Sequence, residues 1–179
     1  QSSAWLDWLF EPGKGDIPKI LQENLSRDGF SPESSIGYAT IPIHSFSSLA
    51  EMLAHSSKSE TLGLYNRFPK FDSGFMALAK TRLLDAVTPA IGDDSGTLLY
   101  NPQTYPTEML LNAYRNIGSR ELAREIWFSN RRSWDGLHGS IYEEDPSAIV
   151  RSLEKDWGTL AMEPPFQSFL TSGYGLGAL

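Results

Sequence analysis

The chain has 179 residues, of which 40% are hydrophobic and 12% aromatic, and this is enough for one compact domain with a buried core. The formal net charge is -7 and there is no basic block, which makes nucleic acid a poor partner. The absence of cysteine excludes disulfides and thiolate-bound metals, and no apolar run approaches the roughly 20 residues of a membrane helix. The start at Gln1 and the strand-like ending GYGLGAL predict a processed or truncated piece of a longer polypeptide.

Two amphipathic helices and a glycine turn are expected at the beginning of the chain. Apolar residues recur at three- and four-residue spacing over residues 2–10 and again over 17–25, which is typical of helices with one buried face. Asp16 is a candidate N-cap of the second helix, and Gly29 can adopt the positive φ that ends it. Asn24-Leu25-Ser26 has the form of an N-glycosylation sequon.

The middle of the chain predicts two longer helices. The first begins near Tyr38 and is broken or delayed by Pro42. Its expected buried stripe is formed by Phe46, Leu49, Met52 and Leu53. The second helix is expected over 69–87, and the segment 89–107, which contains IGDDSG, is expected to be irregular.

A helix pair and then a change of pattern are expected in the last part of the chain. Thr107 is the expected cap of a helix that ends at Gly118, and a second helix over 121–128 follows after a very short turn. A polar, aromatic loop then precedes a short helix over 144–155. From Gly158 onward, glycine, aromatic residues and alternation indicate entry into a β-rich region. The chain is therefore predicted to be mainly α, with helices in a layered α/α array.

The ordered set NL-RDG--PESS-GY, a helix, P-IGDDSG, a helix pair and the terminal SGYGL resembles the heparinase II/III-like polysaccharide lyases. The loop motif is moderately specific, and the order of the other pieces supports it over nearly the whole chain. The resemblance implies an incomplete (α/α) toroid of antiparallel helix pairs over residues 1–157. Residues 158–179 are then the linker and the first strand of a β-sheet domain.

The same resemblance implies an activity and its missing parts. Such lyases cleave uronate-containing polysaccharides by β-elimination, which removes the C5 proton and expels the C4 oxygen. In that family an Asn or His on an earlier helix pair neutralises the uronate carboxylate, and a His from the β-sheet region helps to transfer protons. Neither stretch is present here, so the chain alone is expected to be nearly inactive. The tyrosine of the loop motif is present as Tyr38.

Tyr38 is the candidate catalytic acid or base. A phenol with the ordinary pKa of about 10 is a natural acid, and it acts as a base only where positive charge lowers that value. Arg27 is a candidate source of this charge. Glu33 is a candidate ligand of a sugar hydroxyl or a support for the tyrosine, and equally a helix N-terminal residue favoured by the dipole. The alternative for Tyr38 is a ring packed at a helix start with its hydroxyl in water.

Three further residues are candidate substrate ligands. His44 follows the helix start near Tyr38. Trp134 and His138 lie in an aromatic-rich loop that suits the lining of a sugar groove, and Tyr142 of that loop is a further candidate for stacking on a sugar ring.

No cofactor is required by the sequence. Asp93 and Asp94 resemble part of a loop that binds a divalent cation, but no Glu follows at the right distance. A turn and capping role is therefore favoured, and a structural divalent cation is left open. The expected partners are an acidic polysaccharide and the remaining parts of the same polypeptide, with neither nucleic acid nor membrane.

The resemblance also implies a secreted or periplasmic location. Two other functions stay open. One is a carbohydrate-binding toroid without catalysis, in which the groove aromatics matter and Tyr38→Phe leaves binding intact. The other is a helical interaction scaffold without a sugar site, in which Tyr38 is buried away from any cleft.

Overall fold

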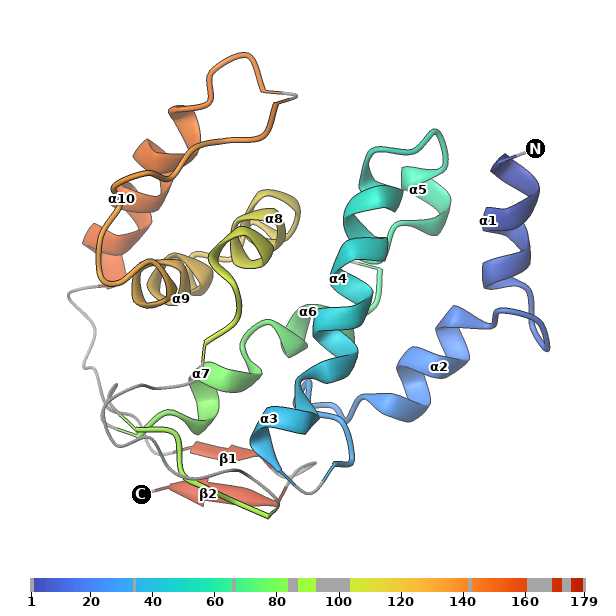
Figure 1. Ribbon diagram of the computed structural model, residues 1–179, viewed down its shortest axis with the longest axis horizontal. Coiled ribbons are helices and arrows are strands. Elements are labelled where there is room, and N and C mark those ends of the chain that lie inside the picture. Colours follow the sequence, from blue (N-terminus) through green and yellow to red (C-terminus); the bar gives the residue numbers. More distant parts are fainter. Residues whose placement is uncertain are drawn as a thin grey trace.

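The computed structural model describes residues 2–33, 35–65, 67–83, 87–92, 104–141, 143–160, 169–171 and 175–178, and this part of the chain is mainly helical (Figure 1). The helices are α1 (Ser2–Phe10), α2 (Ile17–Asn24), α3 (Ile36–Ala39), α4 (Ile41–Ala54), α5 (Ser59–Leu62), α6 (Pro69–Gly74), α7 (Ala77–Thr81), α8 (Thr107–Ile117), α9 (Glu121–Ser129) and α10 (Ala148–Leu160). Two short strands, β1 (Phe169–Thr171) and β2 (Leu176–Ala178), pair antiparallel with Leu170 opposite Gly177.

The helices pack in a layered order. α9 contacts both α8 and α10, and α4 contacts α8, so that α4, α8, α9 and α10 succeed one another across the molecule (Figure 1). α2 packs against α1 and α6. Each of α2, α8, α9 and α10 has a buried apolar face and a polar outer face, which is why these segments are stable as packed helices.

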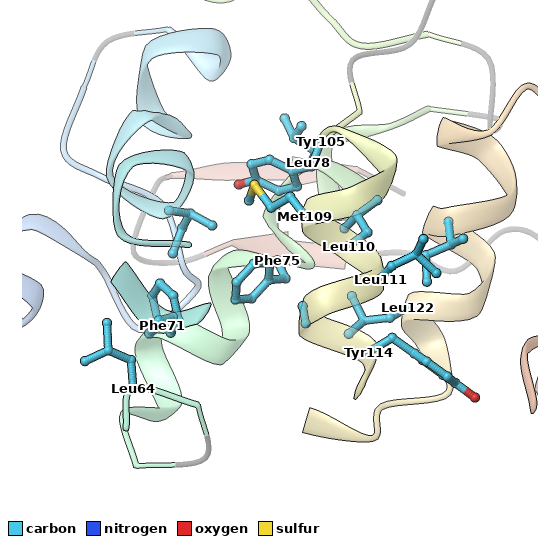
Figure 2. Packing of buried hydrophobic residues seen from close by; sticks show 14 of the residues in the cluster. Leu64, Phe71, Phe75, Leu78, Tyr105, Met109, Leu110, Leu111, Tyr114 and Leu122 are labelled. Atoms are coloured by element: carbon cyan, nitrogen blue, oxygen red, sulfur yellow. The ribbon is translucent and has the colours of Figure 1, made fainter. Parts of the chain in front are cut away.

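One core cluster takes buried residues from α2, α4, α6, α7, α8, α9 and α10. Phe71 and Phe75 meet edge to face with their ring centroids 5.1 Å apart, and Figure 2 shows Phe75 on the side of the apolar residues of α8. The buried Tyr105 hydroxyl donates to the Gly74 carbonyl over 2.9 Å. The Ser129 hydroxyl donates to the Tyr105 carbonyl over 2.7 Å, so Tyr105 joins the end of α6 to the end of α9.

The single helix expected over 69–87 is wrong, because the structure divides it. α6 ends at Gly74 and α7 begins at Ala77, and α7 ends at Thr81. The Gly74 carbonyl accepts the Tyr105 hydroxyl, and a buried ion pair then draws Arg82 into extended backbone with φ -79° and ψ 118°. Both interruptions therefore come from contacts between segments that are distant in the sequence.

Asp16 is confirmed in the N-cap position of α2 but makes no capping hydrogen bond, whereas the expected cap Thr107 is wrong. Asp16 has left-handed backbone with φ 49°, and its carboxylate accepts the Gly13 N–H over 3.0 Å within the preceding turn. Thr107 is the first residue of α8, with Pro106 in the cap position, and its hydroxyl lies 2.7 Å from the Ser129 hydroxyl. In both places the side chain finds a partner outside the helix that it was expected to cap.

The buried face of α4 matches the expected stripe only in part, because Leu53 is shared by both while Phe46 and Leu49 are only half-buried. Ile43, Ala50 and Leu53 are fully buried, whereas Met52 is 65% exposed, because it lies beside the face that α8 covers.

The positive φ of Gly29 and the helix end at Gly118 are confirmed, with φ 89° and 72°. The expected helix end at Gly29 is wrong, because α2 already ends at Asn24 and Leu25 has extended backbone.

Helix α10 begins later and ends later than expected. It starts at Ala148 and continues to Leu160, past the expected boundary at residue 157. Leu153 and Leu160 on its inner face are buried, which explains why the helix continues through Gly158.

Candidate functional site

The loop between α2 and α3 is held in place by a close approach of two glycines. Gly29 has φ 89°, and a Cβ on it would lie 2.5 Å from the Gly74 nitrogen at the end of α6. Only glycine fits such a combination of left-handed backbone and backbone contact. The turn is closed by the Gly29 N–H, which donates to the Ser26 carbonyl over 3.1 Å. The sequence Asp28-Gly29 therefore fixes the loop against α6.

A buried phenylalanine anchors the second half of the loop. Phe30 is fully buried and packs with Ala39 of α3 and Ala77 of α7. The Ser31 N–H donates to the Ala39 carbonyl over 3.1 Å, which ties the loop to α3. The segment that carries the motif is thus packed on α6 and α7 at both of its turns.

Tyr38 lies on α3 with its side chain toward solvent. Ser35 is the N-cap of this short helix, and its hydroxyl accepts the Tyr38 N–H over 3.2 Å. Ile36 and Ala39 are fully buried on the inner side of α3, whereas Tyr38 is 49% exposed. The backbone of Tyr38 is therefore fixed while its phenol is accessible to a ligand.

Positive charge reaches this loop from two elements. Arg27 is exposed at the beginning of the turn. Lys80 of α7 donates from Nζ to the Asp28 carbonyl over 3.3 Å, which places an ammonium group against the same turn. The sequence motif did not indicate Lys80, because it lies 52 residues away from Asp28 and carries no local signal.

Glu33 and His44 lie on either side of α3. Glu33 is exposed in the loop, two residues before the cap Ser35, so the interpretation as a first-turn helix residue is wrong. His44 is exposed in the first turn of α4, which follows α3 directly after Thr40. Arg27, Glu33, Tyr38 and His44 thus belong to one continuous loop-and-helix unit, in which each of them is accessible.

Trp134 and His138 belong to a different part of the molecule. Trp134 is half-buried and packs edge-on against Trp157 of α10, with ring centroids 6.1 Å apart. His138 is exposed, and its Nδ1 donates to the Gly139 carbonyl over 2.9 Å. Figure 1 shows α10 and α3 well apart. The structure therefore does not bring these two residues to Tyr38.

The remaining expectations concern metals and aromatic stacking. Asp93, Asp94 and Tyr142 lie outside the described residues. Within the described part of the chain, no group of three or more His, Asp or Glu side chains is arranged to hold a metal ion. None of the described helices is both long and apolar enough to cross a membrane.

This chain was compared with protein families, curated proteins and solved structures. Neither a family model, nor a curated protein, nor a solved structure matches this chain.

Proposed function

We propose that this chain is part of a polysaccharide lyase that cleaves a uronate-containing polysaccharide by β-elimination. The proposal depends on the ordered motif around Tyr38 and on one structural observation, the half-exposed phenol on a firmly packed helix. A catalytic group needs a fixed backbone and an accessible functional atom, and Tyr38 has both. The toroid and the following β-sheet domain are part of the same proposal.

In this proposal Tyr38 is the group that transfers a proton. A phenol can protonate the departing C4 oxygen, and it can accept the C5 proton only if cations stabilise the phenolate. Arg27 and Lys80 supply two positive charges to the supporting turn, where they also favour an acidic substrate. Glu33 and His44 are the flanking groups for sugar hydroxyls. The groups that neutralise the uronate carboxylate belong to other parts of the polypeptide.

The place of Trp134 and His138 changes with the geometry. Because their loop lies beside α10, they are proposed to meet a part of the polysaccharide distant from the cleaved bond. Stacking on Trp134 alone would then affect substrate binding more than the chemical step.

The test uses the complete natural polypeptide and measures the ultraviolet absorbance of the unsaturated uronate product. Heparan-type, alginate and glucuronan substrates are compared. Replacing Tyr38 by Phe removes only the hydroxyl, and we expect kcat to fall by roughly 10²- to 10⁴-fold, the usual contribution of a general acid or base.

The matched control is Tyr65→Phe, because Tyr65 lies in the aromatic core beside Phe71 and Phe75 rather than at the loop. Its activity should equal that of the natural protein. An unchanged rate for Tyr38→Phe, or no product with any of these substrates, would show that the proposal is wrong. Substrate binding without turnover, unaffected by Tyr38→Phe, would instead support a non-catalytic carbohydrate-binding toroid.

A further inference from the structure

One sequence feature near the candidate site has no role in catalysis, and this is the sequon Asn24-Leu25-Ser26. Among the asparagines of the chain, only Asn24 is followed two residues later by Ser or Thr. N-linked glycosylation requires this pattern, because the hydroxyl at the third position takes part in acceptor recognition. A mature protein keeps a glycan only where its fold leaves room for the sugar, so the surroundings of Asn24 decide whether this asparagine can carry one.

Asn24 is well placed to carry a large group. It is the last residue of α2 and it is exposed, as are its neighbours Gln22 and Glu23. Its Nδ2 donates to the Ile20 carbonyl over 2.9 Å along the outside of the helix. An asparagine amide has two hydrogens, so this hydrogen bond remains possible after one of them is replaced by a sugar.

The next residue turns the sequon outward. Leu25 leaves the helix with extended backbone at φ -127° and ψ 127°, and its side chain is 2% exposed. The buried Leu25 therefore fixes the backbone, while Asn24 on the opposite side faces solvent. A glycan here would disturb neither the core nor the turn at Gly29.

The hydroxyl of Ser26 indicates when the modification would occur. In the folded chain Ser26 is partly buried, and its Oγ accepts the Asp28 N–H over 3.3 Å. This turn engages the hydroxyl that the transferase must recognise. Transfer is therefore expected on the nascent chain, before the loop closes on α6.

We propose that Asn24 carries an N-linked glycan in the mature protein. The donor class is an oligosaccharide linked to a lipid pyrophosphate. A bond forms between Nδ2 of Asn24 and the anomeric carbon of the first sugar, the bond from that carbon to the phosphate oxygen breaks, the lipid pyrophosphate leaves, and the amide loses one proton. The inference rests on the secreted location that the resemblance implies, and it is independent of the lyase chemistry.

The test is peptide mapping of the protein isolated from the cells that make it. Trypsin cuts after Lys19 and Arg27 and releases the peptide ILQENLSR. We expect most of this peptide to carry the mass of a hexosamine-based glycan, and peptide N-glycosidase should remove it and leave Asp at position 24. An unmodified peptide from folded, exported protein would overturn the inference.

Three variants expressed in the same cells separate glycosylation from folding. Asn24→Gln and Ser26→Ala should lose the glycan completely, whereas Ser26→Thr should keep it, because threonine retains the hydroxyl. Circular dichroism of each variant confirms that the helices are intact. An active lyase with bare Asn24 would refute only this inference, and a glycosylated protein without lyase activity would refute only the proposed function.

Discussion

The buried pair Arg82–Glu125 is the most consequential polar contact between side chains distant in the sequence. Arg82 follows α7 and donates twice to the carboxylate of Glu125 on α9, over 3.0 and 2.5 Å, and the two side chains are 1% and 4% exposed. The Arg82 guanidinium also lies 4.7 Å from the ring centroid of Phe128. Two charges taken out of water are tolerated here because each neutralises the other.

Removing one partner should therefore cost more than removing both. Arg82→Met leaves a buried carboxylate without its cation, and we expect the free energy of unfolding to fall by about 3–5 kcal/mol. In the double variant Arg82→Met with Glu125→Leu, most of that loss should be recovered. Urea unfolding monitored by tryptophan fluorescence measures both values. If the double variant is as unstable as the single one, the pair is not the cause.

The same pair shows what a sequence can predict at the residue scale. Its partners are 43 residues apart, and both lie in segments that appear as ordinary amphipathic helix. Apolar periodicity identifies which face of a helix is buried, but not which charged residue is buried with it. Tyr38 is a candidate because its motif is local: the turn glycine, Glu33 and the tyrosine lie within one short stretch of sequence.

At the element scale, replacing three glycines by alanine distinguishes the cost of backbone strain from the cost of a steric clash. Gly29 combines left-handed backbone with the contact to Gly74, Gly118 has φ 72° with open space around it, and Gly158 lies in α10 with nothing within 4 Å. Gly118→Ala should lower the free energy of unfolding by about 1 kcal/mol through backbone strain alone. Gly29→Ala should lower the free energy of unfolding by about 2–3 kcal/mol or more, because the backbone strain and the clash with the Gly74 backbone add together.

Gly158→Ala is the matched control in this set. Its free energy of unfolding should rise by about 0.5–1 kcal/mol, since alanine has a higher helix propensity than glycine. Thermal unfolding of the three variants gives the order. If Gly29→Ala is no worse than Gly118→Ala, the loop at Tyr38 is not fixed by α6, and the pre-organised site of the lyase proposal loses its support.

The carboxylate of Glu143 connects the loop that follows α9 to Arg115 of α8. Glu143 accepts the Ser140 N–H over 3.0 Å and the Arg115 guanidinium over 3.1 Å. These bonds favour the ionised form, so the pKa of Glu143 is held below its ordinary value, first by the Ser140 N–H and then by Arg115. Gly139 allows this arrangement, because any Cβ there would meet the Glu143 carboxylate.

A lowered carboxyl pKa fixes the direction of the pH dependence. The contribution of Glu143 is fully present above the unfolded pKa of about 4.3 and is lost as the pH falls through the folded pKa. The protection of the Ser140 amide, which is its intrinsic exchange rate divided by the observed rate at the same pH, should therefore decrease from neutral pH toward about pH 3. Glu143→Gln should show this low protection already at neutral pH, and Glu144→Gln, an exposed neighbour, should not. Equal exchange at Ser140 in both variants would show that the Glu143 carboxylate does not hold this loop.

At the scale of the whole molecule, the helical class follows from the sequence because amphipathic spacing is a local property. Helix ends are less predictable, since they depend on partners: Gly74 is drawn to Tyr105, and Arg82 to Glu125. The candidate site likewise has a part that the local sequence indicates and a part that only the fold reveals. The unit around Tyr38 is contiguous in sequence and was identified as one, whereas the contribution of Lys80 and the separation of Trp134 are properties of the fold.

Three of the seven tyrosines report on the integrity of this fold. Burial raises the pKa of Tyr105 and of Tyr65, with Glu125 and Glu51 adding to the respective shifts. Burial also raises the pKa of Tyr114, whose hydroxyl donates to Asp156 of α10 over 2.7 Å. All three phenols are therefore held in the neutral form by the packed structure.

A phenol with a raised folded pKa stabilises the fold fully below the unfolded pKa of about 10, and that contribution is lost as the pH rises through the folded pKa. Between about pH 10 and pH 12, we expect these three phenols to ionise together with loss of the helical circular dichroism signal, rather than as independent surface groups. In concentrated urea all seven should titrate in one step near the ordinary value. Tyr114→Phe should remove one phenolate from the cooperative step. Smooth ionisation of every tyrosine before any helix is lost would mean that α8, α9 and α10 do not pack as one unit.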